Sequence, residues 1–272
     1  MQLKPANDDG TVMTLELDHG RANEMGSTQL KAIEAFTATL ESGTVRALVT
    51  FSRRVSRKGT PIFVAGADVT ERVDWDDDHV KEHVRWQRAV LARWRRAPVF
   101  HVAVVHGVAL GWGTELLLTT DYAVATPGAR FGLPETGLGI VPGAGGTAEL
   151  WSRIGVAQAL RLGMTGEPIG ADEALRIGLV QECCDDLDAG LTRAHALASA
   201  VARRSPTAVA AFKRGVLDSI GVTESKRTAI EDIAYSRCVD TGDAAVGRAN
   251  FKAVVEGQPA PWGPLVTEDD PH

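Results

Sequence analysis

The chain has 272 residues, 44% of them apolar and 24% charged, which is ordinary for a soluble globular protein with a sizeable core. This length favours one large domain with an appendage over two equal domains. The net charge of −6, from 29 basic and 35 acidic residues, gives no support for a nucleic-acid partner.

The cysteines and the apolar segments bear on the cellular compartment of the protein. Its three cysteines, Cys183, Cys184 and Cys238, form neither a disulfide framework nor a metal-ligand pattern, so free thiols in a reducing cytosol are expected. The chain begins without an apolar stretch, so no secretory leader is expected. The most apolar segment, residues 99–110, is interrupted by two histidines and is too short to span a bilayer. We therefore expect a cytoplasmic protein with no membrane partner.

Strands and helices alternate through the first two-thirds of the chain. Alternating and continuously apolar runs predict strands, whereas apolar residues at helical spacing, with Ser27 as a cap and Pro98 as a stop, predict helices. The expected strands cover residues 11–17, 45–51, 61–65, 99–105 and 122–125, and the expected helices cover 27–41, 76–96 and 114–118. This alternation, which continues to about residue 182, predicts the α/β class.

The C-terminal part is predicted to be helical. Helix patterns cover residues 186–204, 207–219, 224–238 and 243–256, and only residues 258–272 look irregular. A helical region of this size holds its own core poorly. We therefore expect a core with the functional site at residues 1–200, and a helical region at 201–272 that packs on the core or on a neighbouring subunit.

Three segments combine glycine turns with carboxylates: FVAGADVTE at 63–71, HGVALGWGTELLL at 106–118 and FGLPETGLGIVPGAGGT at 131–147. Each glycine turn frees backbone N–H groups, and a helix N-terminus adds the positive end of its dipole. Two such turns that face each other would polarise a carbonyl.

In this order, the three segments resemble the enoyl-coenzyme A (CoA) hydratase/isomerase (crotonase) family, over about residues 11–180. The AGAD turn at 65–68, GWGTE at 111–115 and the FGLPE and PGAGGT stretches within 131–147 carry the resemblance. It implies a crotonase-like spiral of ββα turns with an α-helical C-terminal region used in trimerisation, and hence a homotrimer or a dimer of trimers. It also implies an acyl-CoA substrate that is processed without a metal or a redox cofactor.

The resemblance also assigns the site residues. The backbone N–H groups of Ala67 and Trp112 would form the oxyanion hole for the thioester oxygen, and Glu115 and Glu135 would be the hydratase pair. Adding water beside a thioester needs one group that activates the water and another that protonates the α-carbon. Two carboxylates near one water repel, so one of them should hold a proton. We expect Glu115 to be the base and Glu135 its acid–base partner; the sequence leaves the reverse assignment open.

Further residues are expected to contact the substrate. Four basic residues precede the AGAD turn and would meet the phosphates of CoA, and three residues of the turn complete the expected CoA site: Arg53, Arg54, Arg57, Lys58, Ala65, Gly66 and Asp68. The expected acyl pocket consists of Trp112, Leu138 and Gly143. Since Trp112 stands where the family usually carries glycine or another small residue, we expect it to restrict or reshape this pocket.

The carboxylate pair favours hydration of a 2-enoyl-CoA, and other functions stay open. A double-bond isomerase needs one glutamate, and thioester hydrolysis or non-catalytic acyl-CoA binding could use the same scaffold. A dinucleotide site is disfavoured because proline replaces the third glycine of the loop at 137–146, and no G-x-S-x-G elbow marks a serine hydrolase. His79 and His83 have zinc spacing, but no third ligand is suitably spaced, so no metal is expected.

Overall fold

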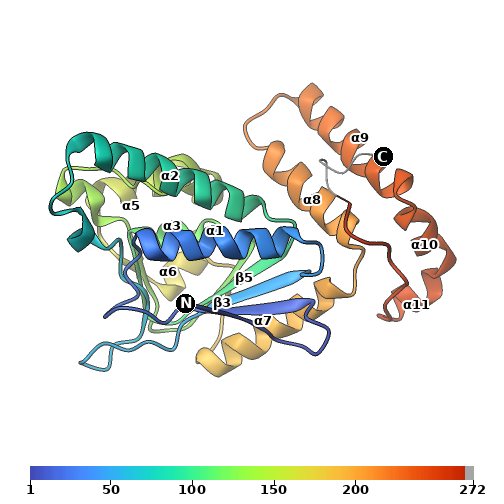
Figure 1. The fold of residues 1–272 in the computed structure, drawn as a ribbon, viewed down its shortest axis with the longest axis horizontal. Helices are drawn as coiled ribbons and strands as arrows, with labels where there is room; N and C mark the ends of the chain where they lie inside the picture. The colour runs from blue at the N-terminus through green and yellow to red at the C-terminus, as the bar shows by residue number, and fades with distance from the viewer. Residues whose placement is uncertain (267–272) are drawn as a thin grey trace.

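The computed structural model describes residues 1–266, which form two β-sheets and the helices around them (Figure 1). The larger sheet has the order β1 (Gln2–Pro5), β2 (Val12–Glu16), β3 (Ala47–Phe51), β5 (Phe100–Val105), β7 (Tyr122–Ala125) and β10 (Glu182–Cys183). β1 is antiparallel to β2, and all the other neighbours are parallel. The smaller sheet has the order β4 (Ile62–Val64), β6 (Val108–Leu110), β8 (Arg130–Gly132) and β9 (Ile169–Gly170), with only β9 antiparallel.

The chain crosses from one sheet to the other in each turn of the fold. β3 belongs to the larger sheet and β4 to the smaller one, and the same holds for β5 and β6, and for β7 and β8. Helices α2 (Asp77–Arg96), α3 (Trp112–Leu117) and α4 (Gly146–Ile154) follow these pairs of strands. This ββα spiral confirms the predicted α/β fold class.

Burial on both faces explains why β3 is apolar almost throughout. In Figure 1, α1 (Ser27–Glu41) and α2 lie over one face of the larger sheet, and α7 (Leu187–Ala202) lies over the other. Leu48 packs with the residues under α1 and α2, whereas Ala47 and Val49 pack with those under α7. Because successive side chains of a strand point to opposite faces, a parallel sheet covered on both sides needs apolar residues at every position.

Each predicted element between residues 11 and 125 overlaps an observed one, and shorter elements were not predicted. The unpredicted ones include the strands β1, β6, β8, β9 and β10 and the helices α4, α5 (Val156–Thr165), α6 (Ala171–Arg176), η1 (Val69–Arg72) and η2 (Pro134–Leu138). In the part of the chain that the structure describes, no helix is both long enough and apolar enough to cross a bilayer.

Residues 206–266 form a C-terminal arm that stands beside the sheets in Figure 1. Its helices are α8 (Pro206–Asp218), α9 (Glu224–Asp240), α10 (Asp243–Ala249) and α11 (Phe251–Val255). The single helix predicted at 243–256 was therefore wrong, because the chain breaks at Asn250, where φ is −110°. The Asn250 amide donates to the Val246 carbonyl and so ends the first of the two helices.

The segment at 258–266 is irregular, as predicted for the tail, yet hydrogen bonds hold it against the end of α7 and the start of α8. The Trp262 indole donates to the Arg203 carbonyl at 2.9 Å, and the Val266 N–H donates to Thr207 Oγ1 at 3.1 Å. The rest of the predicted tail, residues 267–272, lies outside the described residues.

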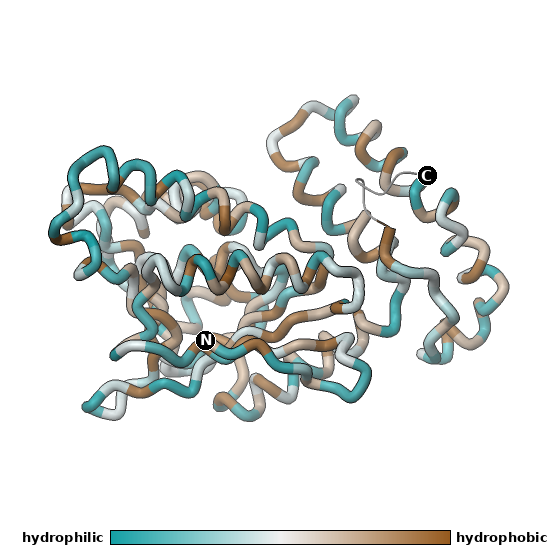
Figure 2. Tube along the Cα trace, viewed as in Figure 1, coloured by the Kyte–Doolittle hydropathy of each residue, from teal (hydrophilic) through white to brown (hydrophobic). Residues whose placement is uncertain are grey.

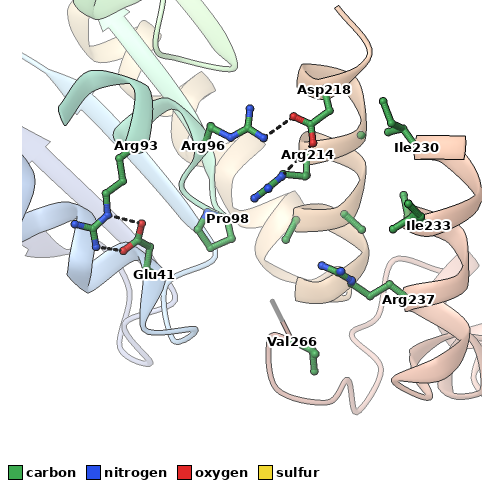
Figure 3. A pocket seen from close by; sticks show the side chains of 14 residues that line it. Glu41, Arg93, Arg96, Pro98, Arg214, Asp218, Ile230, Ile233, Arg237 and Val266 are labelled. Atoms are coloured by element: carbon green, nitrogen blue, oxygen red, sulfur yellow. Dashed lines mark hydrogen bonds and ion pairs between the residues drawn. The ribbon is translucent and has the colours of Figure 1, made fainter. Parts of the chain in front are cut away.

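A cavity of about 600 Å³ separates the arm from the body of the molecule. Figure 3 shows that charged side chains line it, among them Arg96, which pairs with Asp218 of α8. Hydrophilic and hydrophobic segments alternate along the helices of the arm in Figure 2. The helices of the arm thus carry both polar and apolar residues, and the arm is joined to the body partly through ion pairs.

Candidate active site

Glu115 lies on the short helix α3, which begins directly after the glycine turn at Gly111. Gly111 has a φ of +52°, and its N–H donates to the Gly132 carbonyl at 2.8 Å. Thr114 Oγ1 donates to the Ala109 carbonyl at 2.7 Å and accepts from the Gly132 N–H at 3.1 Å. These bonds tie the start of α3 to β6 and β8, so the sheet itself positions Glu115, whose exposed fraction is 2%.

The glycine-rich loop at 144–146 holds the Glu115 carboxylate. Glu115 Oε1 accepts from the Ala144 N–H at 2.7 Å and from the Gly146 N–H at 2.8 Å. A Cβ atom on Gly146 would lie 2.7 Å from the Pro142 Cβ and 3.2 Å from Glu115 Oε1, so only glycine fits there. Both amides bind Oε1, which leaves Oε2 to face a substrate.

Burial raises the pKa of Glu115 to about 7, and the nearby charge of Glu135 adds to the shift. The two backbone N–H bonds oppose it, because they stabilise the ionised form. A carboxyl group with a pKa near neutrality can gain and lose a proton under ordinary conditions, as a general base must.

Glu135 stands in the first turn of η2, after Pro134, and its carboxylate reaches the turn that precedes α3. A Cβ atom on Gly111 would lie 2.6 Å from Glu135 Oε1. Within residues 1–266, Glu135 Oε2 is buried and has no hydrogen-bond partner. Burial also raises the pKa of this carboxyl group. The structure thus brings both predicted glutamates to the Gly111 turn.

Two glycine turns meet where the oxyanion hole was predicted. A Cβ atom on Gly111 would lie 3.8 Å from the Gly66 Cα, so the turns that precede Trp112 and Ala67 are neighbours. Met25 fixes the second turn, because its N–H donates to the Gly66 carbonyl and its carbonyl accepts from Asp68. Among the hydrogen bonds of residues 1–266, none uses the N–H of Ala67 or of Trp112. Both donors are therefore available to a ligand.

Comparison with known proteins decides the family. The sequence profile of the enoyl-CoA hydratase/isomerase family matches residues 13–263. The chain belongs to this family. It is 30% identical to the short-chain-enoyl-CoA hydratase of Clostridium acetobutylicum over 92% of this chain and 95% of that protein. It is 35% identical to the mitochondrial enoyl-CoA hydratase domain-containing protein 2 of Bos taurus over 81% of this chain and 74% of that protein.

Solved structures share the fold of this chain. The crystal structure of an enoyl-CoA hydratase from Bacillus anthracis superposes with a TM-score of 0.85 at 29% identity, covering 96% of this chain and 98% of that one. The Pseudomonas aeruginosa protein DspI superposes with a TM-score of 0.84 at 27% identity, covering 96% of each chain. The predicted crotonase-like architecture is thereby confirmed.

The three residues predicted for the family's acyl pocket lie in different surroundings. Trp112 is 2% exposed and belongs to the main apolar core, whereas Leu138 is 70% exposed. A Cβ atom on Gly143 would lie 3.1 Å from Val84 Cγ1 and 3.8 Å from Gln87 Nε2, both on α2. Gly143 therefore brings the glycine loop against α2, which places α2 beside the site.

The residues predicted to bind CoA divide into two groups. Arg53 forms an ion pair with Asp188 at 3.8 Å, and Arg54 forms one with Asp18 at 3.3 Å, so both have partners within the chain. Arg57 and Lys58 are exposed. In the AGAD turn, Ala65 and Gly66 supply backbone, and Asp68 caps η1 by accepting from Thr70. A second bond, donated by the Thr70 hydroxyl, lowers the pKa of Asp68, and the cap bond adds to this shift.

Asn23 is a site-supporting residue that the sequence reasoning missed. It is fully buried with a φ of +55°, and its amide donates to Ser52 Oγ and to the Phe63 carbonyl, each at 2.9 Å. These bonds join the ends of β3 and β4 just before the AGAD turn. A lone asparagine in RANEM was the available signal, since asparagine is the non-glycine residue that best tolerates a positive φ.

The cavity of Figure 3 lies apart from this chemistry. Neither Glu115 nor Glu135 lines the cavity, which opens between the body and the arm. Within residues 1–266, no group of three or more His, Cys, Asp and Glu side chains could hold a metal. His79 stacks on Trp75 at 4.2 Å between ring centroids.

Proposed function

We propose that this protein hydrates a 2-enoyl-CoA to the 3-hydroxyacyl-CoA. One observation carries the proposal: two buried carboxyl groups with raised pKa values meet at the glycine turn that presents the Trp112 N–H. The relative from Clostridium acetobutylicum, a short-chain-enoyl-CoA hydratase, supports the choice of reaction.

In the proposed reaction, Glu115 Oε2 takes a proton from water while the water oxygen bonds to the β-carbon. The electron pair of the double bond moves to the thioester oxygen, where the N–H groups of Ala67 and Trp112 stabilise the negative charge. Glu135 then gives its proton to the α-carbon as the thioester carbonyl re-forms. Glu115 ends protonated and Glu135 ionised, and exchange with solvent restores the starting state.

The reaction needs one water and two proton transfers, so we propose that it proceeds without a metal or a redox cofactor. The pKa of about 7 suits Glu115 to the base role, because a group already ionised at low pH would be a weaker base. Glu135 Oε2 has no hydrogen-bond partner within residues 1–266, which supports the acid role for that residue.

We also propose that the CoA phosphates meet Arg57 and Lys58, which are exposed and form no ion pair within residues 1–266. The assembly proposed for the chain is a homotrimer or a dimer of trimers, with the C-terminal arm and its exposed apolar residues as the contact region. Free thiols at Cys183, Cys184 and Cys238 support a cytoplasmic setting.

The test is the loss of enoyl-thioester absorbance when the purified protein meets crotonyl-CoA. Glu115→Gln and Glu135→Gln should each lower kcat by about 10²–10⁴-fold, since each removes one proton-transfer group. Thermal unfolding of each variant is the control that separates lost chemistry from lost fold.

Two outcomes would contradict hydration. Conversion of 3-enoyl-CoA to 2-enoyl-CoA without water addition would indicate an isomerase, and binding without turnover would indicate an acyl-CoA binding protein. Exchange of the α-proton with solvent in Glu115→Gln would support Glu135 as the group at the α-carbon. The same exchange in Glu135→Gln would reverse the two roles.

A further inference from the structure

The face of α2 that turns inward near the site carries two polar side chains among its apolar ones. His83 and Gln87 are four residues apart, so they share a helix face, and their exposed fractions are 5% and 3%. Leu91 continues the same face as an apolar residue. Two polar side chains at such depth need partners, because burial removes the water that would otherwise satisfy them.

One polar atom of each side chain lacks such a partner within residues 1–266. Among residues 1–266, Gln87 Oε1 and His83 Nε2 are buried and make no hydrogen bond. The closest ionic group to His83 is Glu71, whose Oε1 lies 3.8 Å from Nε2. Both oxygens of that carboxylate already accept from the Ser27 N–H, at 3.2 and 3.0 Å, at the start of α1. The Glu71 carboxylate therefore already binds the N-terminus of α1.

Gln87 lies against the loop that holds the proposed base. Its Nε2 would be 3.8 Å from a Cβ atom on Gly143, and the next residue, Ala144, donates to Glu115. An acyl chain whose β-carbon sits at Glu115 can therefore continue along α2. On that path Gln87 lies against the Gly143 loop, and His83 lies one helical turn away on the same face of α2.

The groups around His83 determine what it can bind. Burial, followed by the charge of Arg72, lowers the pKa of His83, although Glu71 opposes the shift. The uncharged ring lies beside Trp75, in a tilted contact, and Trp86, in an edge contact, with centroids 4.9 and 5.6 Å away. Within residues 1–266, Nε and Nη2 of Arg72 are also buried and unpaired. A neutral ring, an amide and an arginine together favour an oxygen-containing ligand, above all a carboxylate.

We propose that the acyl pocket takes thioesters whose acyl chain carries an oxygen function beyond the reacting carbons. Gln87 and His83 bind that oxygen, and Arg72 favours a carboxylate over a hydroxyl. This inference rests on the proposed acyl-CoA site but not on the hydration step. It makes Gln87 a specificity-determining residue.

Binding of three saturated five-carbon CoA thioesters tests the proposal by titration calorimetry, since none of them can be hydrated. They are pentanoyl-CoA, 5-hydroxypentanoyl-CoA and glutaryl-CoA, which differ only in the end of the chain. We expect the oxygen-bearing thioesters to bind at least about 10-fold more tightly than pentanoyl-CoA, with glutaryl-CoA the tightest.

Substitutions then locate the selectivity. Gln87→Met keeps the length of the side chain and should reduce the preference for both oxygen-bearing thioesters by about 5–10-fold. Arg72→Met should reduce the preference for glutaryl-CoA alone. Arg88→Met, at the exposed neighbour of Gln87, is the matched control and should leave all three affinities unchanged.

Equal binding of the three thioesters would overturn the proposal, as would a preference that Gln87→Met leaves intact. If none of them binds more tightly than free CoA, the acyl-CoA site itself is wrong and the proposed function fails with it. A parallel loss of affinity for free CoA in Arg72→Met would show that Arg72 contacts the CoA portion and would remove its part in the selectivity.

Discussion

The body of the molecule and its C-terminal arm differ in how far their apolar side chains are buried. In the body, the central strands and the helices over them bury their apolar residues within one chain, and even Glu115 is enclosed. In α9, all of whose residues the structure describes, none is buried, and Phe212 and Tyr235 of the arm are 75% and 73% exposed. The central strands of the body are thus covered within one chain, whereas the arm presents apolar surface that residues 1–266 of one chain do not cover.

The contact between α8 of the arm and the body includes buried polar groups. Lys213 of α8 donates to Asp121 Oδ2 at 2.8 Å and to the Val99 carbonyl at 2.9 Å, and its side chain is 10% exposed. Asp121 Oδ2 also accepts from the His101 N–H at 2.8 Å. The arm is therefore anchored to the ends of β5 and β7 through one carboxylate. The following predictions test this difference between the body and the arm, beginning with the largest expected effect.

Gly111→Ala should damage catalysis far more than the same change in the arm. The positive φ of Gly111 disfavours alanine, and the new Cβ would meet Glu135 Oε1 at 2.6 Å, so we expect kcat to fall by about 10²-fold or more. Gly221 also has a positive φ, of +74°, but no atom lies within 4 Å of its Cβ position. Gly221→Ala should therefore cost about 1 kcal/mol of stability and leave crotonyl-CoA turnover unchanged. Equal losses of activity would contradict the assignment of Gly111 to the site.

Glu115→Gln should alter the pH dependence of stability. The folded-state pKa of Glu115, about 7, lies above its ordinary value of 4.5, so the native state holds a proton that the unfolded state has released between these values. Wild-type stability should therefore fall relative to Glu115→Gln as the pH rises from 4 to 8, by on the order of 3 kcal/mol in total. Urea unfolding of both proteins at several pH values measures this. Parallel stability curves would show that Glu115 is not strained by burial.

Lys213→Met should loosen the arm. It leaves the Asp121 carboxylate and the Val99 carbonyl without their shared donor, so we expect a loss of about 2–3 kcal/mol in the free energy of unfolding. Lys81→Met is the control, because Lys81 pairs with Asp78 on the surface, where the two side chains are 59% and 94% exposed. Its effect should stay below about 0.5 kcal/mol. Faster hydrogen exchange confined to α8–α11 in Lys213→Met would support the anchoring role, and uniform exchange would contradict it.

Phe212→Ser should have the smallest effect on the fold of a single chain. The side chain is 75% exposed, so the free energy of unfolding of a monomer should change by less than about 0.5 kcal/mol. If subunits meet at the arm, however, light scattering should detect a smaller particle for this variant than for the wild type. An unchanged particle size would place the subunit contact elsewhere.

The sequence could predict the chemical groups of the site better than their surroundings. Ordered motifs located Glu115, Glu135 and both glycine turns, and the structure brings all of them together. The two amide bonds to Glu115 could not be predicted, because they join residues 29 and 31 positions apart. The burial of His83 and Gln87 was missed for a related reason, since helical periodicity alone places polar residues on the exposed face.

The prediction of the short strands and helices failed for a different physical reason. β6 lies within HGVALGWG, where the glycines favour a turn, and the strand forms because β4 and β8 pair with it on both sides. Such support comes from distant parts of the chain and leaves no local pattern. The break at Asn250 was equally hidden, because 243–249 and 251–255 both have good helix-forming residues.

The two amide bonds to Glu115 Oε1 also give the proposed reaction a handedness. Rotation of the carboxylate would break both bonds, so the same oxygen faces the substrate in every turnover. Glu135 is close enough to influence the titration of Glu115 and lies against the Gly111 turn, so in the proposed reaction both carboxyl groups act from one side of the enoyl group. Both new bonds should then form on one face. Hydration in heavy water should yield a single enantiomer, with deuterium and hydroxyl added syn.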